Sequence, residues 1–289
     1  MIGLGLLLTM VACDRSPDPI RAALVPDPSA DTQVRVLTSV DRGAHWALHA
    51  APVAHGVSSL HACTYDDTVW VPAVLDVREI AWIESAFPVP FVDVLRSTDL
   101  VHWTADRIRI RADTTGGVDP ACVVGPEGLE MWFAEVSGRE GDPAQGARPS
   151  KIWRTHWKDD HFADGVVVHE GPGLVDPAPT YVGGKLRLFL NKDGARIVEA
   201  VGDTLLPTWD GVTVPQVAEL GGSRWLLAQQ PRGPGMLPIA AELTAGGRAA
   251  SFPLQIDGAL SSCESPSLTT LGATWVLLCV EVARRGPPR

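Results

Sequence analysis

Four side chains in this sequence could do acid–base chemistry if the fold brought them together. His61, Asp119, Asp176 and Glu264 each stand at or beside the start of a hydrophobic strand pattern. In such a set, one carboxylic acid can protonate a leaving group while another carboxylate attacks or activates water. Crowding raises the pKa of at least one carboxyl group, which keeps an acid protonated near neutral pH. These positions therefore predict a hydrolytic site built mainly from carboxylates.

Two of these residues also have a purely structural interpretation. Asp119 and Asp176 both precede a proline. A proline fixes the chain as it enters a strand, and an aspartate side chain can cap the first backbone groups. Both interpretations stay open at the level of sequence.

The elements that must position these residues come in two interleaved series of repeats. The first series consists of turn sequences that begin at Ser39 and Ser97, with a more divergent copy from Thr155. The first two starts lie 58 residues apart, and the next two lie 58 apart again. Short Ser and Asp side chains can accept hydrogen bonds from turn amides, and each turn follows a strand pattern. This series predicts hairpins at a constant period.

The second series consists of five segments, each leading into a tight turn and a hydrophobic strand. These segments begin at Leu60, Val118, Val175, Val214 and Glu264. Each of these inner hairpins except the last is followed by an outer hairpin, whereas the chain begins with an unpartnered outer hairpin at residues 34–49.

The two series together predict an all-β protein, a five-bladed β-propeller over residues 34–289. The ring closes when the N-terminal outer strands pair with the C-terminal inner strands, which also protects the strand edges. A β-sandwich is the alternative fold, but it does not explain the 58-residue period.

Strand order predicts where a site lies. The inner strands of a propeller start at the central funnel, so His61, Asp119, Asp176 and Glu264 converge on one mouth from four blades. Tryptophan can stack on a sugar ring, and amide and guanidinium groups can bind hydroxyl or carboxylate groups. The candidate substrate-binding residues at this mouth are His61, Trp82, Asn191, Gln230 and Arg232.

Inner strands that open with Asp-Pro, and outer hairpins with Ser-Thr-Asp-Leu and a following Trp, resemble the five-bladed glycoside hydrolases of family 43 and its clan relative family 32. The turn at residues 39–46 also resembles the Asp-box of the sialidases. The resemblance implies a base Asp, an orienting Asp and an acid Glu. It assigns these roles among Asp119, Asp176 and Glu264, and Glu170 in Glu-Gly-Pro is the second candidate for the acid. This chain departs from the family pattern at His61, where the family has its base Asp.

The resemblance implies a glycosidase that acts on glycans through the funnel carboxylates. The alternative is a non-catalytic propeller that binds glycan or protein at the cell surface. The formal net charge of −10 argues against a nucleic acid partner. We find no phosphate loop or dinucleotide motif, so we expect no cofactor. The scattered His and Cys residues predict no metal site, and we expect a monomer.

The N-terminus resembles a bacterial lipoprotein signal. Residues 2–12 are largely apolar and too few to span a bilayer, and Met-Val-Ala precedes Cys13 as in a lipobox. We therefore expect a signal peptide at residues 1–13, a lipid on Cys13 and a flexible Pro- and Asp-containing tether at residues 14–33. The protein would then be exported and anchored at the periplasmic or outer face, with the lipid as its only membrane contact. A buried N-terminal strand is the alternative.

Four further cysteines remain, at positions 63, 122, 263 and 279. An exported protein can form disulfides, and four cysteines allow three pairings. The sequence does not choose among these pairings or between disulfides and buried thiols.

Overall fold

The computed structural model describes residues 21–23, 31–75, 91–110, 114, 117–136, 149–232, 235–244, 247–248, 251–254, 256, 260 and 262–282. Within these ranges every regular element is a β-strand. The described residues accordingly contain no long apolar helix of the kind that crosses a membrane. The predicted signal peptide, with Cys13, and the loop that carries Trp82 lie outside the described residues.

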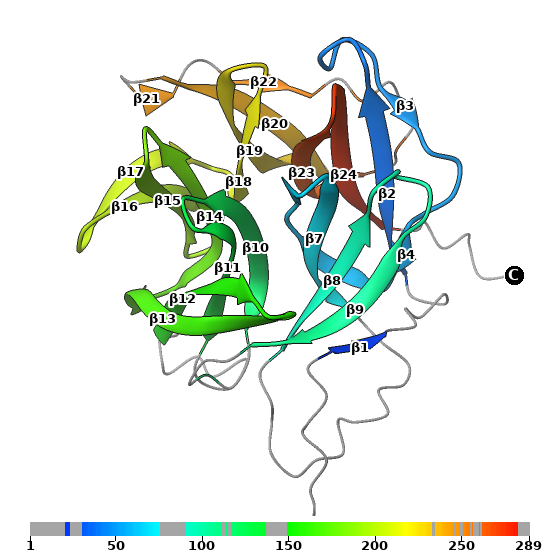
Figure 1. Cartoon of the computed structure of the whole chain (residues 1–289). Coiled ribbons are helices and arrows are strands. Elements are labelled where there is room, and N and C mark those ends of the chain that lie inside the picture. Colours follow the sequence, from blue (N-terminus) through cyan, green and yellow to red (C-terminus); the bar gives the residue numbers. More distant parts are fainter. Residues whose placement is uncertain are drawn as a thin grey trace, which may run out of the picture.

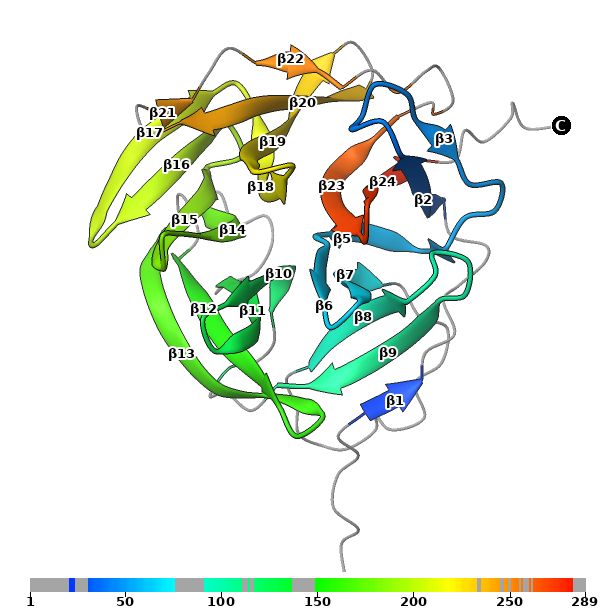
Figure 2. The same ribbon diagram turned by 45° about the horizontal axis from the view of Figure 1, so that its top comes forward.

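Five antiparallel sheets surround a central axis and form a five-bladed β-propeller (Figures 1 and 2). The predicted fold class is confirmed. We number the blades by their inner strands in chain order. Blade 1 consists of β5 (Val57–Leu60), β6 (Cys63–Tyr65), β7 (Thr68–Leu75), β8 (Phe91–Ser97) and β9 (Thr104–Arg109), with β1 (Arg21–Ala23) outermost.

Blades 2 and 3 are regular four-stranded sheets. Blade 2 consists of β10 (Val118–Gly125), β11 (Gly128–Val136), β12 (Pro149–Lys158) and β13 (His161–Pro172). Blade 3 consists of β14 (Leu174–Val182), β15 (Lys185–Lys192), β16 (Arg196–Val201) and β17 (Thr204–Asp210).

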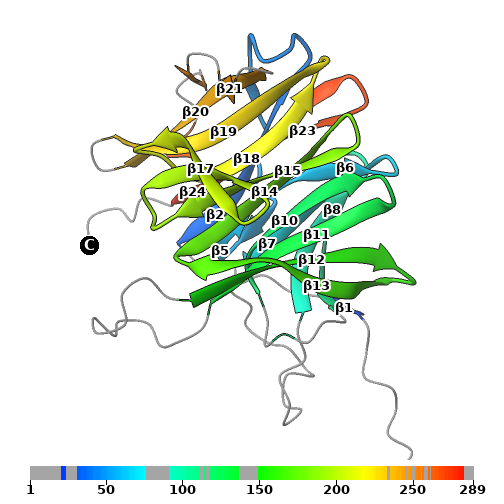
Figure 3. The ribbon, with the colours of Figure 1, turned by 90° about the vertical axis from the view of Figure 1, so that its left-hand side faces the viewer.

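Blades 4 and 5 have short outer strands. Blade 4 consists of β18 (Thr213–Leu220), β19 (Ser223–Arg232), β20 (Gly235–Thr244), β21 (Gly247–Arg248) and β22 (Phe252–Pro253). Blade 5 consists of β23 (Glu264–Leu271), β24 (Thr274–Val282), β2 (Thr32–Ser39), β3 (Ala47–Leu48) and β4 (Ala54–His55). Figure 3 shows the ring from the side.

Blade 5 closes the ring as the repeat arithmetic predicts. The N-terminal strand β2 pairs with the C-terminal strand β24 along its whole length, from Thr32 opposite Val282 to Ser39 opposite Trp275. The two ends of the propeller therefore share one hydrogen-bonded sheet, and no inner strand is left with an unpaired edge at the junction.

The strand β1 extends blade 1 on its outside. It lies within residues 14–33, which the sequence predicts to be a flexible tether, and its Arg21 stands opposite Ile108 of β9. The backbone of the chain before the propeller is therefore tied to blade 1 at this point (Figure 2).

The cores between blades follow from alternation along the second strands. Successive side chains of a strand point to opposite faces, so Trp132 and Phe133 of β11 pack into different interfaces. Trp132 packs with Leu174 and Leu188 of blade 3, and Phe133 packs with Trp70 of blade 1. Adjacent residues of one strand thus hold two neighbouring blades and fix the inner strands around the axis.

The hairpin turns of the first repeat series have the expected hydrogen bonds. The Ser39 hydroxyl donates to Asp41 Oδ1 at 2.7 Å and accepts from the Gly43 N–H at 2.8 Å. Asp99 Oδ1 accepts from the N–H groups of Val101 and His102 at 2.9 and 2.8 Å. These side chains satisfy turn amides that no strand pairs, which explains the periodic Ser and Asp.

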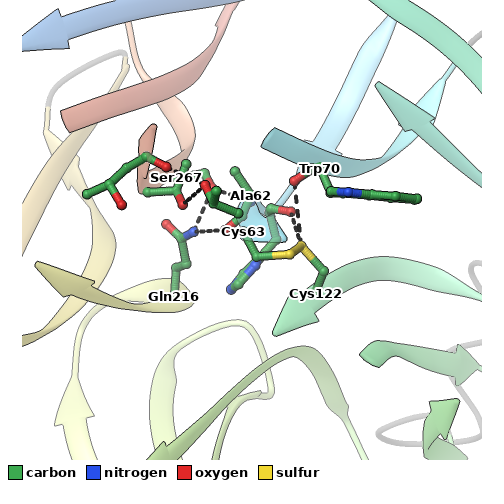
Figure 4. The surroundings of a disulfide bond; sticks show 10 residues. Ala62, Cys63, Trp70, Cys122, Gln216 and Ser267 are labelled. Carbon is green, nitrogen blue, oxygen red and sulfur yellow. Dashed lines mark hydrogen bonds between the residues drawn. A yellow bond between two sulfur atoms is a disulfide. The ribbon is translucent and has the colours of Figure 1, made fainter. Parts of the chain in front are cut away.

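The four cysteines form two disulfides. Cys63 bonds to Cys122 and joins β6 of blade 1 to β10 of blade 2 (Figure 4). Cys263, just before β23, bonds to Cys279 of β24 in blade 5. The structure thus selects one of the three pairings that the sequence left open.

Candidate functional site

A β-bulge at the start of each inner strand of blades 2 to 5 shapes the axial mouth. The register shifts by one residue between Val118 and Ala121 in blade 2, and the other three blades shift at the same place. The left-handed residue in each bulge precedes a proline. These residues are Asp119, Asp176, Val214 and Ser265, with φ of 50°, 50°, 51° and 45°. Aspartate tolerates this conformation better than most residues, because its short polar side chain can bond locally.

The bulges place side chains from all five blades around one small axial cavity. Its lining includes His61 from blade 1, Asp119 from blade 2, Asp176 from blade 3, Val214 from blade 4 and Pro266 from blade 5. The volume of this cavity is about 10 Å³. A space of this size holds about one water molecule. The structure therefore brings together three of the four side chains that the sequence selected.

Asp119 and Asp176 form a coupled pair of carboxyl groups. The Asp119 carboxylate accepts hydrogen bonds from the Ser59 hydroxyl and from the backbone N–H of Asp176. The Asp176 carboxylate accepts a hydrogen bond from Asn191 Nδ2 at 2.7 Å. Both carboxyl groups are only partly exposed. The pair is therefore held at the cavity by neutral donors from blades 1 and 3.

Burial and mutual repulsion shift the titration of this pair. Burial raises the pKa of Asp119 above its usual value. Burial, followed by the charge of Asp119, raises the pKa of Asp176 to about 7. When two carboxyl groups lie close to each other, the charge of one opposes ionisation of the other. Asp176 is therefore partly protonated near neutral pH.

His61 is a buried, neutral member of the same cavity. Its exposed fraction is 6%, and burial lowers its pKa to about 3. Neither ring nitrogen has a hydrogen-bond partner in the described part of the chain. The imidazole therefore contributes polarity without positive charge, and its position holds no carboxylate.

The two glutamates proposed as the acid do not join the aspartate pair. Glu264 lies one residue before the bulge of blade 5 and stands opposite Val280, so it corresponds to Val118. The residue of blade 5 that corresponds to Asp119 is Ser265, whose N–H donates to Gln229 Oε1 at 3.1 Å. Glu264 is not among the described residues that line the axial cavity.

Glu170 lies farther from the axis. It is an exposed residue of β13, the outermost strand of blade 2, where it stands opposite Lys151. Its similarity to the Glu-Gly-Pro acid motif is therefore a similarity of local sequence on an outer strand.

The predicted substrate-binding residues fall at different places. Asn191 is buried and holds Asp176, as described above. Gln230 is exposed on β19, and Arg232 is the last residue of that strand. Sequence reasoning missed Ser59 and Gln229, which hold Asp119 and Ser265. Ser59 and Gln229 lie close in sequence to the predicted residues His61 and Gln230, but their hydrogen bonds depend on the bulges, which the sequence pattern does not reveal.

A group of hydrogen-bonded residues joins three blades near the axis (Figure 4). Gln216 Nε2 donates to Ser267 Oγ at 2.6 Å and to the Ala62 carbonyl at 3.3 Å, while Gln216 Oε1 accepts from the Leu268 N–H at 2.7 Å. The Ala62 N–H also donates to Ser267 Oγ. These residues, which we name the axial plug (Ala62, Gln216 and Ser267), come from three blades. Gln216 lines the small axial cavity, and Ala62 lines a second cavity farther along the inner strands.

Metal coordination has no evident basis in the described ranges, since no group of three or more His, Cys, Asp or Glu side chains there is arranged to hold an ion. We name the axial cavity with its two carboxyl groups the aspartate mouth, and Asp119 and Asp176 can transfer protons and make hydrogen bonds there.

Comparison with known proteins shows similarity in fold. No family model matches the sequence, and no curated protein matches it. A thermostable family-43 glycoside hydrolase superposes with a TM-score of 0.52 at 12% identity, over 81% of this chain and 96% of that one. A structure from the GH130 family of mannoside phosphorylases, which contains glycoside hydrolases, gives a TM-score of 0.51 at 9% identity, over 81% and 86% of the two chains.

A third structure extends the match along this chain. The xylan β-1,4-xylosidase of Bacillus halodurans gives a TM-score of 0.50 at 13% identity, and covers 94% of this chain and 60% of the xylosidase. Identities this low show a shared architecture. The chain thus has the fold of the five-bladed β-propeller glycoside hydrolases.

Proposed function

We propose that the aspartate mouth binds carbohydrate and that Asp119 and Asp176 hydrolyse a glycosidic bond there. The observation that carries this proposal is the coupled pair on the axis, in which burial and the charge of Asp119 raise the pKa of Asp176 to about 7. A carboxylic acid with that pKa is protonated often enough at neutral pH to act as a general acid.

The roles follow from the two environments. Protonated Asp176 donates its proton to the glycosidic oxygen as the bond to the sugar breaks. Ionised Asp119 stabilises the positive charge that develops on the sugar and either attacks the anomeric carbon or activates water. Asn191 and Ser59 orient the two carboxyl groups through their hydrogen bonds.

A second candidate function is glycan binding without catalysis. It is favoured by His61, which is neutral and stands where the family pattern has its base, and by the absence of Glu264 from the lining of the axial cavity. In that case the aspartates serve as hydrogen-bond partners for sugar hydroxyls.

The experiment combines a glycan array with hydrolysis assays on the glycans that bind. We expect D119N and D176N to lose at least a hundredfold in turnover, while the matched controls E264Q and E170Q retain it. Binding without turnover by the unaltered protein, with weaker binding in D176N, supports the second candidate. Equal binding and turnover in all four variants and the unaltered protein would contradict both.

We also propose that the protein is exported and anchored through a lipid on Cys13. Two disulfides support an oxidising compartment, where such bonds persist. The test is metabolic labelling with a fatty acid in a bacterial host. We expect label and membrane association in the unaltered chain and the loss of both in C13S. Unlabelled protein that fractionates with C13S would contradict lipid anchoring.

A further inference from the structure

The inner strands also bound a space at the end of the axis opposite the aspartate pair. Below the axial plug, a second cavity of about 250 Å³ is bounded by the second halves of the inner strands of all five blades. The axial cavity lined by Asp119 and Asp176 is much smaller, with a volume of about 10 Å³. A cavity of about 250 Å³ has room for several waters, or for one small ring with its hydroxyl groups.

Hydroxyl groups dominate the polar part of this second cavity. Thr64 Oγ1 lies 2.9 Å from Thr269 Oγ1 and also donates to the Thr270 carbonyl. Thr180 lines the same space from blade 3, with an exposed fraction of 7%. A threonine hydroxyl can donate and accept at once, so these groups can match the hydroxyls of a neutral ligand.

The rest of the lining supplies apolar surface and little net charge. Tyr181 offers an aromatic wall and is held by its hydroxyl to Glu130, with O–O distances of 2.8 and 3.0 Å. Glu219 stands at the cavity and is paired with Arg224 at 3.2 Å. None of the described lining residues is Lys, Arg or His. This composition disfavours phosphate and carboxylate ligands and favours a neutral one.

We propose that this cavity is a second binding site, which takes a neutral polyol the size of a single sugar ring. The inner strands of five blades supply the walls, the threonine hydroxyls and Tyr181 supply recognition, and the axial plug contributes Ala62 to this cavity and Gln216 to the one at the aspartate pair. The site therefore works independently of the proposed hydrolysis.

The test is saturation-transfer NMR on the full chain with D-glucose, D-xylose, D-mannose and myo-inositol as probes. We expect saturable binding of at least one probe, and about tenfold weaker binding in T180V, because valine keeps the shape of threonine and removes its hydroxyl. E170Q alters an exposed side chain that lines neither cavity and is the matched control, and we expect it to bind as the unaltered protein does. D176N is measured beside it to report on the aspartate mouth. T269V provides a second variant, with the same expected direction, should T180V fail to fold.

The outcomes separate this site from the proposed function. Binding that is lost in D176N and kept in T180V and T269V would place the sugar at the aspartate mouth and overturn the second site. Failure of all four probes to bind at tens of millimolar would overturn it as well. Binding of inorganic phosphate in preference to the neutral probes would contradict the proposed ligand class.

Discussion

The carboxylate of Asp119 accepts a hydrogen bond from the backbone N–H of Asp176, so two acidic residues from neighbouring blades meet at the axis of the propeller. The bulges make this contact possible, since each turns its aspartate into the left-handed conformation at the start of an inner strand. One consequence is a pair of carboxyl groups whose titrations depend on each other.

The aspartate pair should make stability fall as pH rises. The pKa of Asp176 is about 7 in the folded protein, against 3.8 for a free carboxyl. Between these values the folded state binds more protons than the unfolded state, so the free energy of unfolding decreases from about pH 4 to pH 7 and this contribution levels off above that. D176N removes the titrating group. Urea unfolding across this range should show a shallower decline in D176N than in the unaltered protein; parallel curves would contradict the pKa shift.

The hydrogen bond from Asn191 should lower the pKa of Asp176. Asn191 Nδ2 donates to its carboxylate at 2.7 Å, which favours the charged form. N191A should therefore raise the pKa of Asp176 above about 7 and shift the alkaline limb of any hydrolytic pH profile, where the general acid loses its proton, in the same direction. NMR titration of the carboxyl carbon measures the change. An unchanged or lowered pKa would mean that Asn191 does not hold the carboxylate in solution.

The buried carboxylate of Glu130 should be a major contributor to stability between blades 2 and 3. It is fully buried and accepts hydrogen bonds from Trp132 Nε1, Arg154 and Tyr181 at 2.8 to 3.0 Å. E130A leaves these donors without their partner and should cost about 3 kcal/mol in the free energy of unfolding. E170A alters an exposed side chain and should change that energy by less than about 0.5 kcal/mol. Equal losses in denaturant unfolding would contradict the assignment.

The disulfide between Cys63 and Cys122 should stabilise the protein more than the other one. It closes a separation of 59 residues, whereas the bond between Cys263 and Cys279 closes 16. In the chain-entropy treatment the longer loop contributes about 4 kcal/mol and the shorter about 3 kcal/mol. The double variants C63A/C122A and C263A/C279A, compared by denaturant unfolding, should show this order. A reversed order would mean that local packing outweighs loop entropy.

The sequence predicted the ring because closure depends on repeats, which are visible one strand at a time. The outer hairpin at residues 34–49 has no inner hairpin before it, and the inner hairpin that begins at Glu264 has no outer hairpin after it. The pairing of β2 with β24 joins the two. The same logic located Asp119 and Asp176 on one axis. Both calculations use only period and strand order.

The details of the site depend on contacts that a repeat does not specify. The bulge in blade 5 turns Ser265 toward the position of Asp119 and leaves Glu264 one residue earlier, a shift that motif similarity does not reveal. Gln216 donates hydrogen bonds to Ala62 and Ser267, which lie on two other blades, and a repeat pattern does not specify such contacts between blades. The partners Cys63 and Cys122 likewise lie on different blades, and the folded ring brings blades 1 and 2 side by side.

The most direct test of the central claim is the pKa of Asp176, measured by NMR titration of its carboxyl carbon in the unaltered protein and in D119N. The account predicts a value of about 7 in the unaltered protein, and a lower value in D119N that stays above 3.8 because burial remains. A pKa near 4 in the unaltered protein, unaffected by D119N, would contradict the coupled pair and with it the acid–base role of the aspartate mouth.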